Sequence, residues 1–148
     1  MNRKKHVLQW HIIHRCNLRC RQCYQEEYQS ESSLENLKKI FYQYINFCTE
    51  HHFKGHINFT GGEPFLSENL FSLLRLCEDS GITYGILTNG TLLDKETVQK
   101  LSALKKLSFV QVSIDGSRKV HDKVRGQGNF KKAFYGLKLL KRAGIQTM

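Results

Sequence analysis

The chain has 148 residues, of which 40% are hydrophobic and 24% are charged, a composition typical of globular proteins that dissolve in water. No Pro-rich, Gly/Ser-rich or repetitive tract marks a linker, so we expect one domain over residues 1–148. The longest apolar stretches have the length of strands, which excludes a membrane-spanning helix. The apolar run after the basic start is interrupted by Gln9 and His11, unlike a signal peptide, and we expect a cytoplasmic protein.

The formal net charge of +10 raises the question of a nucleic-acid partner. Lys and Arg are spread along the chain, and their pairs fall in segments with helical periodicity, which is typical of solvated helix faces. No nucleic-acid-binding motif accompanies the charge, so the sequence disfavours that partner. A basic surface does favour the electrostatic steering of an acidic protein.

Strands and helices are predicted to alternate along the chain. Runs rich in β-forming residues predict strands over residues 7–13, 56–60, 83–88 and 109–114. Apolar residues at helical spacing predict helices over residues 34–48, 66–77, 94–104 and 130–140. Residues 145–148 are expected to begin a fifth strand. We expect a capping box from Ser32 to Glu35, a helix cap at Asp94 and a helix end at Gly81.

Three of the five cysteines, Cys16, Cys20 and Cys23, lie in one short loop after the first predicted strand. Thiolates at this spacing can hold three irons of a cubic iron–sulfur cluster and leave the fourth iron open to a ligand. The alternative is a structural zinc site in which His14 is the fourth ligand. The other two, Cys48 and Cys77, lie on the inward stripes of predicted helices and are expected to be buried core thiols.

Four consecutive βα units predict an α/β fold with a parallel sheet, and ligands of such sheets gather at the carboxyl ends of the strands. Every polar motif of this chain follows a predicted strand. After the cysteine loop, these motifs are Gly61-Gly62-Glu63-Pro64, Asn89-Gly90, and Ser113 with Asp115 and Gly116. Each is also an ordinary turn sequence. Their shared position nevertheless predicts one site at this edge of the sheet.

The Gly-Gly pair of the second motif has two interpretations. It can simply make a tight turn, with Pro64 starting a helix. It can also let a ligand approach the backbone, while Glu63 offers a carboxylate to a cationic amino group. Further along, His121, Asp122 and Arg125 fall in a predicted loop, where charged side chains are usually solvated.

A resemblance to a known family rests on five motifs in order. They are Cys16-Asn-Leu-Arg-Cys20-Arg-Gln-Cys23-Tyr24, Thr60-Gly-Gly-Glu-Pro64, Thr88-Asn-Gly-Thr91, Ser113-Ile-Asp-Gly116 and His121-Asp-Lys-Val-Arg125-Gly126. From about residue 7 to the last residue, the chain resembles the radical S-adenosylmethionine (radical SAM) superfamily. More narrowly, it is similar to the peptide- and protein-modifying enzymes that usually carry a SPASM domain. The resemblance implies a partial (βα) barrel, truncated here after about four βα units.

The resemblance also implies cofactors and site residues. A 4Fe–4S cluster would be held by Cys16, Cys20 and Cys23, and S-adenosylmethionine would chelate its open iron. The resemblance places the cofactor's amino group at the turn, its ribose at Ser113 and its carboxylate near Arg125; the turn residues are Gly61, Gly62 and Glu63. Reductive cleavage of the cofactor would give a 5′-deoxyadenosyl radical that abstracts a hydrogen atom from a substrate.

The implied partners are a peptide or protein substrate and an acidic electron donor such as flavodoxin or ferredoxin. Gln22 stands where the family commonly has an aromatic residue near adenine, and the sequence assigns no catalytic acid or base. A function of another class is also open, namely a zinc-stabilised binding module without catalytic activity. Zinc would not require the Gly61 to Glu63 turn, which favours the enzyme.

Overall fold

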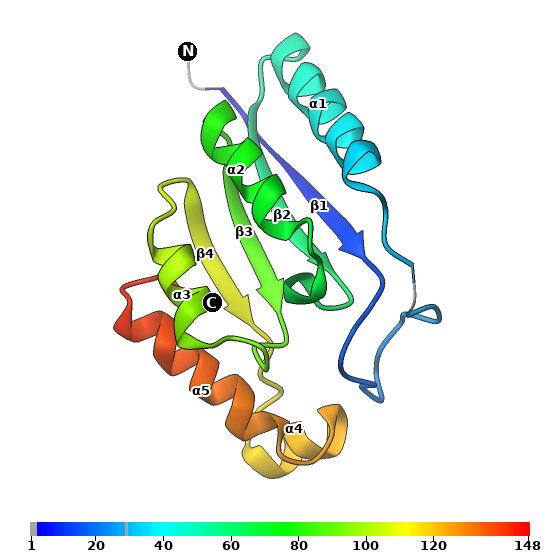
Figure 1. Ribbon diagram of the computed structural model, residues 1–148, viewed down its shortest axis with the longest axis vertical. Helices are drawn as coiled ribbons and strands as arrows, with labels where there is room; N and C mark the ends of the chain where they lie inside the picture. The colour runs from blue at the N-terminus through cyan, green and yellow to red at the C-terminus, as the bar shows by residue number, and fades with distance from the viewer. Residues whose placement is uncertain (1–2, 29) are drawn as a thin grey trace.

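Four parallel strands form one sheet in the computed structural model, which describes residues 3–28 and 30–148 (Figure 1). The strand order β1-β2-β3-β4 follows the chain order. The strands are β1 Lys5–Ile13, β2 Lys54–Gly61, β3 Thr83–Thr88 and β4 Leu107–Val112. Parallel pairing in this order requires a crossover after each strand, and helices supply these crossovers. The α/β sheet predicted from the sequence is confirmed.

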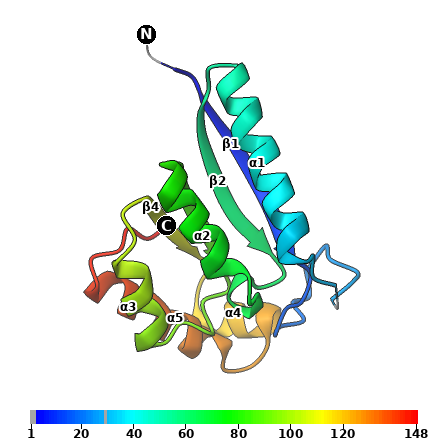
Figure 2. The same cartoon turned by 45° about the horizontal axis from the view of Figure 1, so that its top comes forward.

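Helices cover one face of the sheet (Figures 1 and 2). They are α1 Leu34–Glu50, α2 Leu70–Ser80, α3 Lys95–Ser102 and α5 Asn129–Arg142, with a short 3₁₀ helix, η1, at Pro64–Leu66. A further helix, α4 Arg118–Arg125, lies next to α5 at the lower end of the molecule (Figure 1). The core lies between the covering helices and the sheet, where Phe41 of α1, Phe59 of β2 and Leu74 of α2 are fully buried. Cys48 and Cys77 are buried in this core, as predicted. Over the described residues, no helix has the length and apolar character that crossing a bilayer requires.

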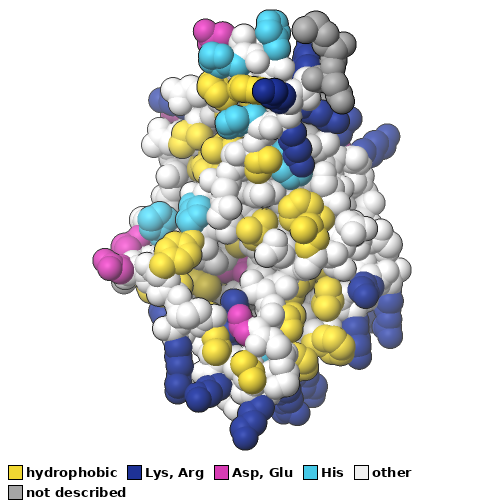
Figure 3. All heavy atoms as spheres, turned by 180° about the vertical axis from the view of Figure 1, so that it is seen from behind, with side chains coloured by type: hydrophobic (Ala, Val, Ile, Leu, Met, Phe, Trp, Pro, Cys, Tyr) yellow, Lys and Arg dark blue, Asp and Glu magenta, His cyan; other side chains and the backbone are white. Residues whose placement is uncertain are grey.

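The other face of the sheet lacks such a helical cover. Alternate strand residues point to opposite faces, and Val7, Gln9 and Gln111 are exposed. Seen from behind, the molecule shows hydrophobic and His side chains among uncharged groups, while Lys and Arg lie near the upper end and again toward the lower end (Figure 3). The lower end contains α4 in Figure 1. Two polar residues of the uncovered face, Gln9 and Gln111, also line a cavity at the carboxyl ends of the strands.

Helix ends follow the predicted signals closely but not everywhere. The Asp94 carboxylate accepts a hydrogen bond from the Thr97 N–H at 2.7 Å, and Gly81 ends α2 in the left-handed region at φ 72°. The predicted capping box is wrong by one residue, because Ser33 rather than Ser32 caps α1 through the Asn36 N–H. Gly62 to Ser67 fold into the turn and η1, so α2 begins at Leu70 rather than at residue 66.

The prediction of a solvated loop over His121 and Asp122 is wrong. These residues belong to α4, and both are buried. The His121 ring contacts the Phe130 ring edge to face at 5.6 Å, and the Asp122 carboxylate accepts a hydrogen bond from the Phe130 N–H at 2.8 Å. Because the buried face of α4 contains these polar groups, hydrophobic periodicity does not reveal the helix.

The last residues extend the sheet beside β4. Val110 forms an isolated parallel bridge with Thr147, and the Val110 N–H donates to the Gln146 carbonyl at 2.9 Å. The predicted start of a fifth strand over residues 145–148 thus appears only as this isolated bridge, and the sheet of the described residues has four strands. β4 itself ends at Val112, before the Ile114 expected from the sequence.

Candidate active site

A cavity of about 350 Å³ lies at the carboxyl ends of the strands. Its lining comes from the cysteine loop and from the ends of all four strands. The residues are Gln9, Cys16, Cys20, Gln22, Cys23, Tyr24, Gln25, Thr60, Gly61, Gly62, Leu87, Thr88, Asn89, Gln111, Ser113 and Arg125. Of the eight residues assigned to the site from the sequence, Glu63 alone does not line this cavity. The motifs therefore meet in space, as their positions after the strands predict.

The three clustered cysteines face this cavity together. The Cys16 thiol accepts hydrogen bonds from the Leu18 N–H at 3.4 Å and from the Asn89 side-chain amide at 3.9 Å. Burial raises the pKa of the Cys16 thiol. It also raises the pKa of Cys20, although the Arg125 guanidinium opposes that change. Both thiols are therefore protonated at neutral pH in the metal-free chain, and metal binding must release their protons.

His14 lines a different hollow from the three thiols. Its Nδ1 is 3.1 Å from the Glu27 carboxylate. Among residues 3–28 and 30–148, no three His, Cys, Asp or Glu side chains are placed to share one metal ion. A cubic cluster presents a separate iron to each thiolate, so its ligands need not converge on one point. The donor set therefore fits a 4Fe–4S cluster better than the Cys₃His zinc site.

The Gly61-Gly62 turn lies against the start of the cysteine loop. The Gly62 N–H donates to the Ile13 carbonyl and the Glu63 N–H to the Arg15 carbonyl, each at 2.8 Å. A Cβ at Gly62 would lie 2.1 Å from the Arg15 carbonyl oxygen, and one at Gly61, where φ is +131°, would lie 2.2 Å from that of Ile13. The glycines are thus required first by the close approach of two backbone segments. This close approach is a third reason for the glycines, besides the tight turn and the room for a ligand that the sequence indicates.

Glu63 is fully buried, with its carboxylate bonded inside the protein. It accepts hydrogen bonds from the Thr88 hydroxyl at 2.7 Å, the Asn89 N–H at 2.8 Å and the Phe65 N–H at 3.2 Å. Burial raises its pKa, and these three donors oppose the change. In this geometry, Glu63 joins the ends of β2 and β3. It holds Thr88 and Asn89 in the cavity wall.

We expect Glu63→Gln to destabilise the chain by about 1–3 kcal/mol. The carboxylate of Glu63 accepts three hydrogen bonds, and the NH₂ group of a glutamine would face at least one of these donors without being able to accept from it. Urea unfolding of the metal-free protein measures this difference. Glu68→Gln is the matched control, since Glu68 is exposed one turn away. Equal free energies of unfolding for the two variants would contradict the structural role of Glu63.

Arg125 reaches the cavity from the end of α4. Its guanidinium donates to the Asp115 carboxylate through Nε and Nη2, the latter at 3.2 Å, and this pairing lowers the pKa of Asp115. Nδ1 of the buried His121 lies 3.6 Å from the same carboxylate. Ser113 lines the cavity beside them, with its N–H donating to the Thr88 carbonyl at 3.0 Å. Asp115 thus fixes the direction of the Arg125 side chain.

The sequence model that describes the Radical SAM superfamily matches residues 10–148 of this chain, and this match decides the family. The chain belongs to the radical SAM superfamily. Its members are enzymes that use a 4Fe–4S cluster and S-adenosylmethionine, so the predicted family and cofactors are confirmed.

Three relatives show how far the likeness extends. The chain is 37% identical to the Fe-coproporphyrin III synthase of Methanosarcina barkeri, over 97% of this chain and 36% of the relative. It is 34% identical to the antilisterial bacteriocin subtilosin biosynthesis protein AlbA of Bacillus subtilis, over 90% and 30%. The structure of native anSMEcpe with bound AdoMet and Cp18Cys peptide superposes with a TM-score of 0.77 at 26% identity, covering 97% and 42%.

The likeness confirms the fold of a partial radical SAM barrel. The chain spans about a third of the length of the curated relatives it matches. One of them is named for a porphyrin and one for a bacteriocin, and the solved structure holds a peptide. The radical SAM family therefore includes relatives with unlike substrates.

Residues at or beside this radical SAM site that were not predicted from the sequence include Asn17, which supports the cavity wall, and Gln9 and Gln111, which line it. Asn17 accepts a hydrogen bond from the Asn89 side-chain amide and donates to the Thr91 hydroxyl, both at 2.9 Å, and so joins the cysteine loop to the end of β3. Nothing in the sequence signals this contact. Gln9 and Gln111 had a weak signal, because each is a polar residue between apolar neighbours of a strand, Gln9 in the middle of β1 and Gln111 near the end of β4.

Proposed function

We propose that this chain is part of a radical SAM enzyme that modifies a peptide or protein. The observation that carries the proposal is the single cavity that gathers the three loop thiols, the Gly-Gly turn, Ser113 and Arg125. Cys16, Cys20 and Cys23 would hold the cluster. Backbone groups of Gly61 and Gly62 would meet the amino group of S-adenosylmethionine, and Ser113 would meet its ribose.

Arg125 is proposed to bind the carboxylate of S-adenosylmethionine. Asp115 engages two guanidinium nitrogens and leaves other N–H groups of Arg125 to face the cavity. When bound, the cluster supplies the one electron that splits the cofactor into methionine and a 5′-deoxyadenosyl radical, which takes a hydrogen atom from the substrate. The protein's part is to orient the cofactor and to exclude water.

The carboxamides of the cavity support a peptide substrate. Gln9, Gln22 and Gln111 line it, as does Gln25, whose amide nitrogen already donates to the His14 and Glu27 carbonyls. Among the described lining residues, Arg125 is the one permanently charged side chain. Carboxamides donate to and accept from the neutral amide groups of a peptide main chain. The second candidate substrate is an iron porphyrin that bears several carboxylates. It is favoured by the 37% identity to the Fe-coproporphyrin III synthase.

The proposal is tested with anaerobically reconstituted protein, chemically reduced and supplied with S-adenosylmethionine. Peptide libraries, iron coproporphyrin III and buffer are compared, and 5′-deoxyadenosine and modified product are measured separately. We expect a brown protein that forms 5′-deoxyadenosine, with product from peptides. Product from the porphyrin alone would select the second candidate. A colourless protein with stoichiometric zinc and no cleavage of the cofactor would instead establish the zinc-stabilised binding module.

We further propose a cytoplasmic location and an acidic electron donor such as flavodoxin or ferredoxin. All five cysteines are free thiols in the structure, which suits a reducing compartment. The net charge of +10 favours an acidic partner.

A further inference from the structure

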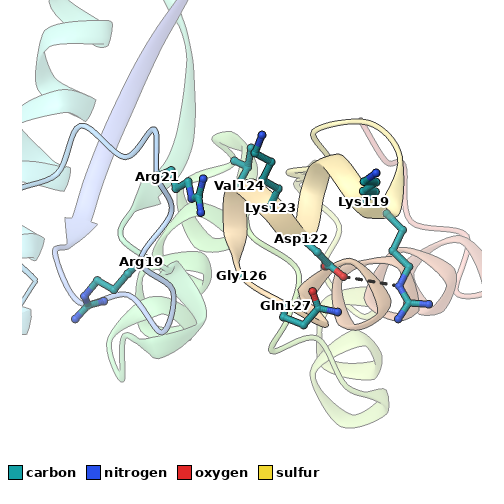
Figure 4. Close-up of a pocket in the computed structure, with 9 residues that line it drawn as sticks. Arg19, Arg21, Lys119, Asp122, Lys123, Val124, Gly126 and Gln127 are labelled. Carbon is teal, nitrogen blue, oxygen red and sulfur yellow. Dashed lines mark ion pairs between the residues drawn. The ribbon is translucent and has the colours of Figure 1, made fainter.

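A second hollow, of about 700 Å³, lies between the cysteine loop and α4 (Figure 4). It is lined by Arg19, Arg21, Arg118, Lys119, Asp122, Lys123, Val124, Gly126 and Gln127. None of these residues lines the cofactor cavity. The two hollows nevertheless share their walls, since Cys20 and Gln22 face the cavity while Arg19 and Arg21 line the hollow. The cysteine loop therefore separates the hollow from the cavity.

The exposed lining of this hollow is positively charged. Its five Lys and Arg side chains are exposed and come from the cysteine loop and α4. The single acidic residue of the described lining, Asp122, is buried and forms an ion pair with Arg118 at 3.7 Å (Figure 4). Its carboxylate also accepts a hydrogen bond from the Phe130 N–H at 2.8 Å. Its charge is thus balanced within the protein. An approaching molecule meets mainly cations.

The two walls of the hollow are joined by the backbone. The Arg21 N–H donates to the Val124 carbonyl at 2.9 Å, which ties the cysteine loop to the last turn of α4. At the end of α4, the Gly126 N–H donates to the Asp122 carbonyl at 3.0 Å. The first of these bonds holds the backbone of α4 beside the backbone of the cysteine loop.

We propose that this hollow is the docking surface for an acidic protein that delivers single electrons to the cluster. The inference rests on the proposed function, because only a bound cluster needs a reductant. The donor protein loses one electron and the cluster gains it, so no bond forms or breaks and no proton moves. A group of neighbouring cations steers an acidic partner by charge complementarity. Arg19 and Arg21 are the chain neighbours of Cys20, so the hollow borders the loop that would hold the cluster.

The lining favours a protein over a nucleic acid. Surfaces that bind single strands combine cations with aromatic side chains on which bases stack, and no aromatic side chain is among the described residues lining this hollow. The cations are also exposed on the hollow's rim, as shown by the 67% exposure of the Arg118 side chain. Exposed cations of this kind can contact acidic side chains on the surface of another protein.

The test uses the cluster-loaded protein and reduced flavodoxin as the acidic probe. Lys119→Glu/Lys123→Glu reverses two charges of α4, and Lys38→Glu/Lys141→Glu makes the same change in net charge on exposed positions of α1 and α5. Stopped-flow absorbance gives the rate constant of cluster reduction, and calorimetry gives the affinity for oxidised flavodoxin. At low salt we expect both to fall about tenfold in the α4 variant and less than about twofold in the control. The difference should vanish near about 0.5 M salt, where charges are screened.

Uncharged photoreduced 5-deazariboflavin separates docking from the cluster itself. It should reduce the cluster at equal rates in the unaltered protein and in both variants. A protein that holds no reducible cluster would refute the proposed function, whatever flavodoxin does. With an intact cluster, an equal response of the two double variants to flavodoxin would overturn the docking surface. The docking surface would also be overturned if the α4 variant lost tenfold in affinity for a single-stranded DNA oligonucleotide but kept its affinity for flavodoxin.

Discussion

Replacement of Cys16, Cys20 or Cys23 by alanine is expected to reduce bound iron and sulfide to background. Each thiol lines the same cavity, and each would hold a different iron of the cluster, so no neighbouring side chain can take its place. Iron and sulfide are counted after anaerobic reconstitution, together with absorbance near about 400 nm, which is typical of iron–sulfur clusters.

Cys48→Ala and Cys77→Ala are the matched controls, because both thiols are buried among apolar side chains of α1 and α2. They should keep a full cluster and lose only packing, about 1–2 kcal/mol in the free energy of unfolding. Retention of a full cluster by Cys20→Ala would refute the ligand assignment. Loss of the cluster in Cys77→Ala would show that cluster content merely reports stability.

Gly62→Ala is expected to disturb both the cluster and the cofactor site. The added Cβ would lie 2.1 Å from the Arg15 carbonyl oxygen and 2.5 Å from that of His14, so the chain leading to Cys16 must move. We expect a loss of about 3 kcal/mol in stability, at the upper end for overpacking, with reduced iron content and weaker binding of S-adenosylmethionine. Denaturant unfolding, iron counting and titration calorimetry measure the three effects.

Gly81→Ala is the control for this substitution. Gly81 adopts a left-handed φ of 72°, but no atom lies within 4 Å of its Cβ position. It should cost about 1 kcal/mol of stability and leave iron content unchanged. A Gly62→Ala protein with normal stability and a full cluster, impaired only in cofactor binding, would support a role in ligand clearance alone.

The sequence predicted the order and kind of most elements because strand and helix periodicities alternate clearly. It failed at α4, where the residues turned inward are His121 and Asp122, and polar groups on a buried face leave no apolar stripe. It also placed the polar motifs at one edge of the sheet correctly, since parallel strands all end there. Both predictions depend only on short stretches of sequence, namely the periodicity of each element and the residues that directly follow each strand.

The partners of each site residue could not be predicted in the same way. Glu63 has three donors that come from two segments of the chain, and the Gly62 turn approaches the backbone of Arg15, far away in sequence. Such contacts arise only after strands β1, β2 and β3 are side by side. A motif thus indicates where chemistry is performed, but the hydrogen bonds that its residues make are decided by tertiary pairing.

The pairing of β1 with β2 also constrains how the protein is made. Lys5 pairs with Lys54 and His11 with Thr60, so β1 and the thiol-bearing loop have no sheet partner until the ribosome has released β2. During this interval, the loop lacks the bonds from Gly62 and Glu63 that later hold it. Nascent chains therefore expose their thiols to oxidation before the pocket exists. Insertion of iron and sulfide is expected to follow the docking of β2 rather than to nucleate folding.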